Sequence, residues 1–287
     1  MHPETEQLFA LLGDIVKNLN SGGRGIGSEG NYPFRPLVWD TSEQGEFSFV
    51  KLLQTSGLMV EIELDELIQS WQGKFLNRRR LSQEQNRVLF SETLSKYQLL
   101  FETLQTKLVN LRSYKIETYD ERRGEISNDQ FRRYNLSSVI VGQTNDGNWV
   151  AFSQQLPPSD RAGFGKRLPK QDYRMSQAAL ALNEQLDPIL LDLKSLIVCQ
   201  FASTFDMVIE AIIRATGLLG IWYFNIFDVE QGAGNPYQYG EFEKFVASYL
   251  KNPLIYVFGN GSLYRLYIIG KCRTGDWLGA LTLAVWT

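Results

Sequence analysis

The chain has 287 residues, a formal net charge of −3, 44% hydrophobic residues and 21% charged residues, which is typical of a globular protein with one large or two ordinary domains. This balance excludes the basic footprint of a general nucleic-acid-binding protein, so we expect no direct nucleic-acid contact. The sequence contains no run of about 18 apolar residues, so we expect no membrane span. Its first residues also lack the pattern of a secretory signal. Because the only cysteines are Cys199 and Cys272, we expect a cytoplasmic location.

The scarcity of histidine restricts the chemistry further. The only histidine is His2, near the start of the chain, whereas a Ser-His-Asp or Cys-His site needs a positioned histidine. A zinc site needs three or four ligands that are mostly Cys or His. A site made of carboxylates alone stays open, but no clustered Asp/Glu motif points to one. We therefore expect no enzymatic activity, no cofactor and no metal of its own.

The first part of the chain predicts two helices and two strands. Apolar residues at helical spacing indicate a helix over residues 4–20. Apolar and alternating runs then predict strands at 35–40 and 58–65, the second with an apolar face that extends to Leu64. The clearest element is a long amphipathic helix over 82–110, which begins with a Ser-x-x-Gln capping box.

The second part of the chain begins after a region without periodicity. Residues 157–172 are rich in Pro, Gly and charged residues, as expected for a linker. The pattern then predicts a helix over 176–196, a buried apolar strand within 218–228 and a shorter helix over 239–250.

Three sequence matches relate the two parts in the same order. The matching pairs are Gly142 with Gly270, Gly147 with Gly275, Trp149 with Trp277, residues 108–114 with 250–256, and residues 52–59 with 212–219. The glycine and tryptophan pairs are each 128 residues apart, and both sets are typical of a hairpin with a glycine turn. We interpret the matches as a divergent tandem duplication, and coincidence in a hydrophobic chain is the alternative.

These elements predict an α+β fold in two tandem domains. Helices around a mainly antiparallel sheet are typical of a two-layer or three-layer sandwich. We expect the first copy at 1–156, the linker at 157–172 and the second, diverged copy at 173–287.

Two motifs resemble the nuclease A inhibitor family. One is Glu-x-x-Tyr-Pro-Phe at Glu29–Phe34, which an aliphatic strand ending in Trp follows; the other is Leu-Lys-Asn-Pro-x-x-Tyr at Leu250–Tyr256, with the final hairpin after it. The resemblance covers most of residues 4–156 as one copy and 176–287 as a second copy. It implies an α-β-α sandwich in each copy, which agrees with the element pattern, and a non-enzymatic role.

The resemblance also implies a partner and a set of binding residues. Family inhibitors bind a sugar-non-specific, Mg²⁺-dependent nuclease and block its active site. The acidic residue three places before Tyr-Pro-Phe and the final threonine approach the nuclease's metal centre, and these positions correspond to Glu29 and Thr287. With Tyr32 they form the expected partner-binding set. A carboxylate or hydroxyl suits this role because Mg²⁺ prefers hard oxygen ligands.

The sequence departs from the family pattern in ways that keep a second reading open. Glu29 belongs to the first half and Thr287 to the second, and Trp71 comes too early to match the family's inhibitory tryptophan. The alternative is a protein-interaction or assembly module on the same scaffold without a nuclease target. The spatial relation of Glu29 and Thr287 discriminates the readings, because a shared face favours inhibition.

Overall fold

The computed structural model describes residues 1–21, 32–76, 83–119, 133–156, 173, 175–193, 196–224, 240–260 and 263–285. These residues form two compact units. The first unit combines the described residues of Met1–Ser48 with those of Gly217–Thr287, and the second combines those of Phe49–Pro157 with those of Gln171–Thr216. Each unit holds helices and one antiparallel sheet, which confirms the expected α+β class. No described helix is both long and apolar enough to cross a lipid bilayer.

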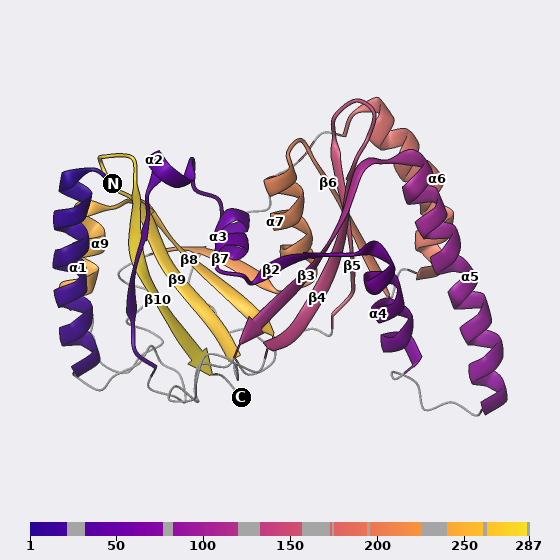
Figure 1. Cartoon of the computed structure of the whole chain (residues 1–287), viewed down its shortest axis with the longest axis horizontal. Coiled ribbons are helices and arrows are strands. Elements are labelled where there is room, and N and C mark those ends of the chain that lie inside the picture. Colours follow the sequence, from indigo (N-terminus) through magenta and orange to yellow (C-terminus); the bar gives the residue numbers. More distant parts are fainter. Residues whose placement is uncertain are drawn as a thin grey trace. The chain divides into compact units, whose positions relative to one another are not determined.

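The first unit contains a five-stranded sheet in the order β1-β10-β9-β8-β7 (Figure 1). Its elements are α1 (Pro3–Ser21), β1 (Arg35–Trp39), α2 (Thr41–Gln44), β7 (Leu219–Tyr223), α9 (Gly240–Tyr249), β8 (Lys251–Asn260), β9 (Leu263–Lys271) and β10 (Trp277–Val285). β1 is an edge strand, which is where a residue such as Pro36, with no N–H to donate, is tolerated.

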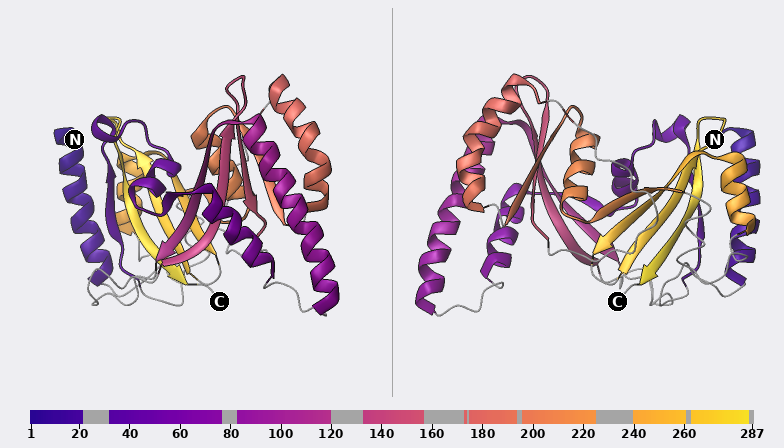
Figure 2. Two further views of the ribbon diagram at one scale, coloured as in Figure 1. Left: turned by 45° about the vertical axis from the view of Figure 1, so that its right-hand side comes forward. Right: turned by 180° about the vertical axis from the view of Figure 1, so that it is seen from behind.

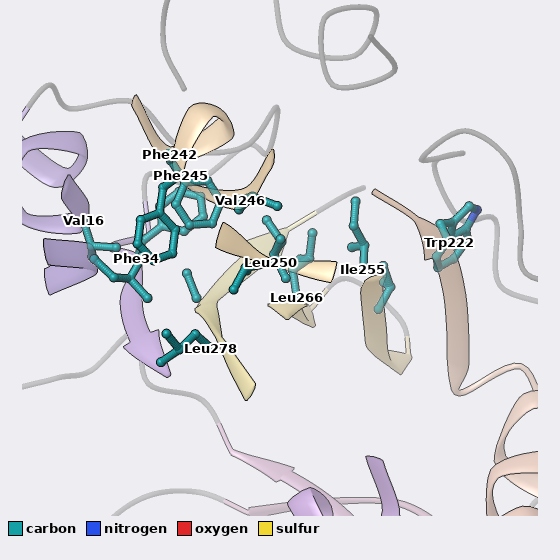
Figure 3. Close-up of a cluster of buried hydrophobic side chains, with 14 of the residues drawn as sticks. Val16, Phe34, Trp222, Phe242, Phe245, Val246, Leu250, Ile255, Leu266 and Leu278 are labelled. Atoms are coloured by element: carbon teal, nitrogen blue, oxygen red, sulfur yellow. The ribbon is translucent and has the colours of Figure 1, made fainter. Parts of the chain in front are cut away.

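Helices α1 and α9 pack on one face of this sheet and form a core with it (Figure 3). In α1, Leu8, Leu12 and Val16 recur at helical spacing and are buried in this core. Phe34, immediately before β1, is also buried there, and its ring centroid lies 6.0 Å from that of Phe242 in α9. The entry into β1 is therefore anchored in the core of the first unit.

The second unit contains a sheet in the order β2-β3-β4-β5-β6. Its elements are α3 (Phe49–Thr55), β2 (Met59–Ile62), α4 (Leu64–Leu76), α5 (Gln83–Lys107), β3 (Val109–Tyr119), β4 (Arg133–Gln143), β5 (Trp149–Gln154), α6 (Gln177–Leu193), β6 (Ile197–Ala202) and α7 (Phe205–Ala215). A salt bridge of 2.9 Å between Lys96 and Asp192 links α5 to α6.

Helices lie on both faces of the second sheet, with α4, α5 and α6 on one face and α7, against which α3 packs, on the other (Figure 2). Trp71 of α4 and Leu186 of α6 share a buried cluster with Phe152 of β5. On the opposite face, the ring of Phe205 in α7 meets those of Tyr114 and Trp149 edge to face, at centroid distances of 5.7 and 5.4 Å. The second unit thus has α-β-α layers, whereas α1 and α9 of the first unit cover a single face.

In each sheet, one edge strand comes from the opposite side of residues 157–172 in the sequence to the strand with which it pairs. β1, from before this region, pairs with β10, and β6, from after it, pairs with β5. Helices α1 and α6 accompany these strands into the cores of the same units. The compact units therefore differ from the expected domains 1–156 and 173–287, because each half gives its first helix and strand to the sheet of the other half.

A buried carboxylate fixes the α1–β1 segment at both of its ends. Asp276, in the turn before β10, accepts a hydrogen bond of 2.7 Å from the Thr5 hydroxyl in α1. Its other oxygen accepts one of 2.9 Å from the backbone N–H of Thr41, just after β1. Thr41 in turn donates its hydroxyl to the carbonyl of Gly275 at 3.0 Å. Residues far apart in the sequence are thus joined inside the first unit.

The matched sequence segments have matching local structures in the two units. Asn110 in β3 and Asn252 in β8 have positive φ angles of 52° and 48°, and each lies at a shift in strand register. A Cβ added at Gly142 in β4 or at Gly270 in β9 would lie 2.9 Å from the Leu108 or Leu250 side chain, respectively. The paired turn glycines also have positive φ, namely Gly57 with Gly217 and Gly147 with Gly275.

Most expected elements lie close to their observed bounds, and one expectation is wrong. α1, α5, α6 and α9 match the helices expected over 4–20, 82–110, 176–196 and 239–250. The strand expected over 58–65 ends at Ile62, and Leu64 begins α4 instead. The physical reason is that Asp65 and Glu66 occupy the first turn of α4, where acidic side chains stabilise a helix N-terminus.

Candidate functional site

The candidate site lies where β1 begins and β10 ends. The two strands are antiparallel, with Arg35 opposite Leu281. The residues before β1 therefore lie beside the residues that follow Leu281. The Thr282 hydroxyl donates a hydrogen bond of 3.1 Å to the Tyr32 carbonyl, which shows that this neighbourhood continues beyond the paired strands. We call residues 32–35 and 281–282 the Tyr32 end of the sheet.

At the Tyr32 end, buried side chains stabilise the structure, and more exposed side chains are available for contact with a partner. Phe34 and Thr282 are only 3% and 2% exposed. Tyr32 is half-buried, while Pro33 and Arg35 are exposed. The surface here therefore consists of an aromatic ring, a proline and a guanidinium group, set on a buried base.

The structure places one of the three expected binding residues at this end. Tyr32 is part of it, whereas Glu29 and Thr287 lie outside the described residues. In the sequence, Glu29 precedes Tyr32 by three residues, and Thr287 follows Val285 by two. The described segments that lead to Glu29 and Thr287 are thus neighbours in one sheet, although they come from the two halves of the sequence.

The described part of the chain offers little for metal binding. No group of three or more His, Cys, Asp or Glu side chains within it could hold a metal ion. The two cysteines are both free, Cys199 partly buried and Cys272 buried. This statement covers the described residues alone, which do not include Glu29 or Thr287.

Trp71 has a structural role. Its side chain is fully buried in the second unit, and its indole N–H donates a hydrogen bond of 2.7 Å to the Ser138 hydroxyl. Its ring also packs against Tyr97 and Phe101 of α5, at centroid distances of 6.2 and 5.9 Å. Trp71 is therefore a core residue of the second unit.

The corresponding end of the second sheet is built differently. There, β6 pairs with β5 from Ile197 opposite Gln154, and the N–H of Gln155 donates to the carbonyl of Leu196 at 2.8 Å. Only residues 194–196 separate α6 from β6, whereas residues 22–34 separate α1 from β1. The second sheet therefore has no counterpart of the long segment that carries Glu29 and Tyr32.

Sequence reasoning did not single out two residues that shape the Tyr32 end, Asn20 and Thr282. Asn20, near the end of α1, makes two hydrogen bonds with the backbone of Phe34. Thr282 did leave a signal, since it is the only hydroxyl-bearing residue of β10. A buried hydroxyl of this kind needs a hydrogen-bond partner, and the Tyr32 carbonyl provides it.

The comparison with protein families decides the relationship for the first part of the chain. Residues 14–122 match the family model described as nuclease A inhibitor-like protein. The chain carries a nuclease A inhibitor-like region. This confirms the resemblance for a stretch that runs from α1 to the end of β3 and includes Glu29 and Tyr32 but not Thr287.

The nuclease A inhibitor-like region crosses the boundary between the compact units, since α1 and β1 lie in the first unit and β2, α5 and β3 in the second. The match does not extend to the second half of the chain. No curated protein matches the chain.

Proposed function

We propose that the chain is a non-enzymatic inhibitor of a Mg²⁺-dependent, sugar-non-specific nuclease, and that Glu29, Tyr32 and Thr287 contact that nuclease together. The observation that carries the proposal is the pairing of β1 with β10, which brings segments of both sequence halves to the Tyr32 end of one sheet. The nuclease A inhibitor-like match over residues 14–122 supports the same class of partner.

Covalent geometry supports a shared location for the two residues outside the described segments. A chain spans at most about 3.6 Å per residue. Glu29 is therefore within roughly 11 Å of Tyr32, and Thr287 within roughly 7 Å of Val285. Because β1 and β10 are adjacent, both residues are tethered to the same end of the first sheet. The division of the set between the halves is then no obstacle to inhibition.

The proposed chemistry uses oxygen ligands at a metal centre that the nuclease supplies. A carboxylate at position 29 would take the place of a phosphate oxygen or a water on Mg²⁺, and a threonine hydroxyl offers a second hard oxygen. The negative charge of Glu29 would also favour encounter with a nuclease cleft that attracts phosphate. Tyr32, half-buried at the base of the segment, would contribute aromatic contact area at the edge of the interface.

We also infer that the halves are tandem copies, 1–156 and 173–287 joined by 157–172, which have exchanged their first helix and strand. The paired bulges at Asn110 and Asn252 support common descent. Only the first sheet has a long segment before its exchanged strand, so one chain should bind one nuclease.

The test is a titration of the nuclease with increasing amounts of the protein, with residual DNA cleavage in Mg²⁺ as the readout. Wild type should abolish cleavage at one chain per nuclease. Glu29→Gln should weaken inhibition by about 2–5 kcal/mol, or roughly 30-fold to several thousand-fold, because it leaves the metal centre without its charged ligand. Thr287→Ala should weaken it by a smaller factor.

Glu46→Gln is the matched control. Glu46 is exposed and forms a 3.4 Å surface pair with Lys271, at the end of the sheet opposite Tyr32. Surface pairs of this kind contribute little, so inhibition should not change. Full cleavage at a large excess of wild-type protein would contradict the proposal for that nuclease. Equal weakening by Glu29→Gln and Glu46→Gln would contradict the role of Glu29.

The alternative function is a protein-interaction or assembly module without a nuclease target. The second unit favours it, because its sheet has the family-like layers but no segment corresponding to residues 22–34. Under this alternative, the protein would leave cleavage unchanged, and Glu29→Gln would behave like wild type in every assay of partner binding.

A further inference from the structure

The backbone of Phe34 is held by a side chain from α1. The Phe34 N–H donates a hydrogen bond of 2.7 Å to the Asn20 side-chain oxygen, and the Asn20 side-chain nitrogen donates one of 2.8 Å to the Phe34 carbonyl. A single carboxamide thus satisfies both polar groups of one residue, as a neighbouring strand would do. This contact joins the end of α1 to the residue just before β1.

A second contact comes from the neighbouring strand. Thr282 in β10 is buried, and its hydroxyl lies 3.1 Å from the Tyr32 carbonyl and 3.4 Å from the Pro33 carbonyl. The ladder between β1 and β10 begins only at Arg35. The Thr282 hydroxyl therefore connects the chain before Arg35 to β10, through a side-chain hydrogen bond beyond the paired strands.

These contacts act on three successive residues. The Phe34 ring is fixed in the core, its backbone is held by Asn20, and the Tyr32 carbonyl is held by Thr282. The Tyr32 ring itself is half-buried and takes no part in these hydrogen bonds. A tyrosine with a fixed backbone and a partly free ring presents contact area at a low cost in conformational entropy.

We propose that Asn20 and Thr282 are positioning residues that fix the backbone at Tyr32 before a protein partner binds. This inference rests on the proposed function, because it gives Tyr32 a role in the nuclease interface. Binding then avoids the ordering of residues 32–34, and the gain should appear as slower dissociation of the complex. Neither residue needs to touch the nuclease to have this effect.

The test compares matched variants of the full-length protein in two independent assays. Thr282→Val removes the hydroxyl but keeps the shape, while Thr282→Ser keeps the hydroxyl. Asn20→Ala removes the carboxamide, and Asn18→Ala is the control on the same helix, because Asn18 is exposed and only its backbone carbonyl accepts a hydrogen bond, from Ser21. The first assay is hydrogen exchange of the Phe34 amide, and the second is the dissociation rate of the nuclease complex.

The expected results differ between the variants. Asn20→Ala and Thr282→Val should each speed exchange at Phe34 by roughly fivefold or more, as expected for the loss of one or two net hydrogen bonds of about 1 kcal/mol each. Both should also speed dissociation from the nuclease by a similar factor. Thr282→Ser and Asn18→Ala should resemble wild type in both assays. Exchange in the β9 strand should not change, which separates local release from general loss of stability.

Three results would overturn the inference, and they are distinguishable. Unchanged exchange at Phe34 in Asn20→Ala and Thr282→Val would show that the contacts do not fix the backbone. Faster exchange with unchanged dissociation would show that the contacts are structural only. If wild type does not bind the nuclease, the proposed function fails, and the role of Asn20 and Thr282 in binding fails with it, even where the exchange results agree.

Discussion

Asp40 illustrates how a single residue secures the end of β1. It follows β1 directly and caps α2, accepting hydrogen bonds of 2.9 Å from the Ser42 N–H and 2.6 Å from the Ser42 hydroxyl. Its second oxygen lies 2.6 Å from the Met1 amino group. The hydrogen bond from this ammonium group, together with those from Ser42, lowers the pKa of Asp40 from 3.8 to about 2.

This shift predicts a pH dependence of stability. In the unfolded chain Asp40 regains a proton near pH 4, whereas in the folded protein it stays ionised to about pH 2. The unfolded state therefore binds more protons in this window, and the folded state loses stability as the pH falls from about 4 to about 2. Asp40→Asn should reduce the slope of unfolding free energy against pH in that window, as measured by urea unfolding at several pH values.

Ser42→Ala serves as the matched variant for the Asp40 prediction. It removes the 2.6 Å hydroxyl bond but keeps the bond from the backbone N–H and the contact with Met1. Its slope should fall between those of wild type and Asp40→Asn. Identical slopes in wild type and Asp40→Asn would contradict the assignment of the shift to these partners.

At the residue scale, the sequence was informative where a motif exists and uninformative where geometry decides. The Tyr-Pro-Phe motif singled out Tyr32, whose carbonyl lies beside β10, and its part in binding stays a prediction. The contacts of Asn20 and Thr282 could not be predicted, because each depends on a partner that the sequence does not specify. Thr282 contacts a residue 250 positions away, and nothing in a threonine's sequence context indicates that partner.

At the element scale, the two units share a close contact between a strand glycine and a leucine. A Cβ at Gly142 would lie 2.9 Å from Leu108 Cδ1, and one at Gly270 would lie 2.9 Å from Leu250 Cβ. Both leucines directly follow the helix that precedes the bulged strand, α5 in one unit and α9 in the other. In both sheets, glycine at this position leaves room for the leucine side chain.

We predict that Gly142→Ala and Gly270→Ala each destabilise the protein by about 1–3 kcal/mol, because the added methyl group overpacks the strand against a leucine.

Gly13→Ala should have the opposite effect on stability. Gly13 lies within α1, and a methyl group added there would have no neighbouring atom within 4 Å, so alanine should stabilise the helix by roughly 0.5–1 kcal/mol. Urea unfolding of the three variants measures the differences, and neutral effects at both strand glycines would contradict the packing argument.

Helices were easier to predict from the sequence than their neighbours. α1 and α5 have long apolar stripes, and their observed bounds lie within a few residues of the expected ones. α4 was missed, since its first residues continue the apolar alternation of β2, and only Asp65 and Glu66 mark the start of a helix. Alternation and helical spacing coincide over such short stretches, so burial in the folded protein decides between them.

At the scale of the whole molecule, the partner of each first strand could not be predicted. The apolar pattern of β1 indicates burial but does not specify the strand with which β1 pairs. Contacts outside the repeated pattern favour the observed pairing, such as those of Asp276 with Thr5 and Thr41. This pairing is also what makes a shared binding end from Glu29, Tyr32 and Thr287 feasible, so the proposed function depends on it.

A disulfide test addresses the pairing of β1 with β10 most directly. Arg35 lies opposite Leu281 in β10, and Ser153 is the residue of β5 that corresponds to Leu281, 128 positions earlier. Paired Cα atoms in adjacent strands are close enough for a disulfide. Two proteins are needed, Arg35→Cys with Leu281→Cys and Arg35→Cys with Ser153→Cys. In both, Cys199 and Cys272 are changed to alanine and a protease site is placed within residues 157–170.

The measurement is non-reducing, denaturing electrophoresis after oxidation and cleavage of the protease site. We predict that Arg35→Cys with Leu281→Cys keeps the two pieces joined until a reductant is added, while Arg35→Cys with Ser153→Cys retains free thiols. Separate pieces in the first protein, together with loss of free thiols in the second, would show that β1 pairs within its own half and would contradict the exchange of strands between the halves.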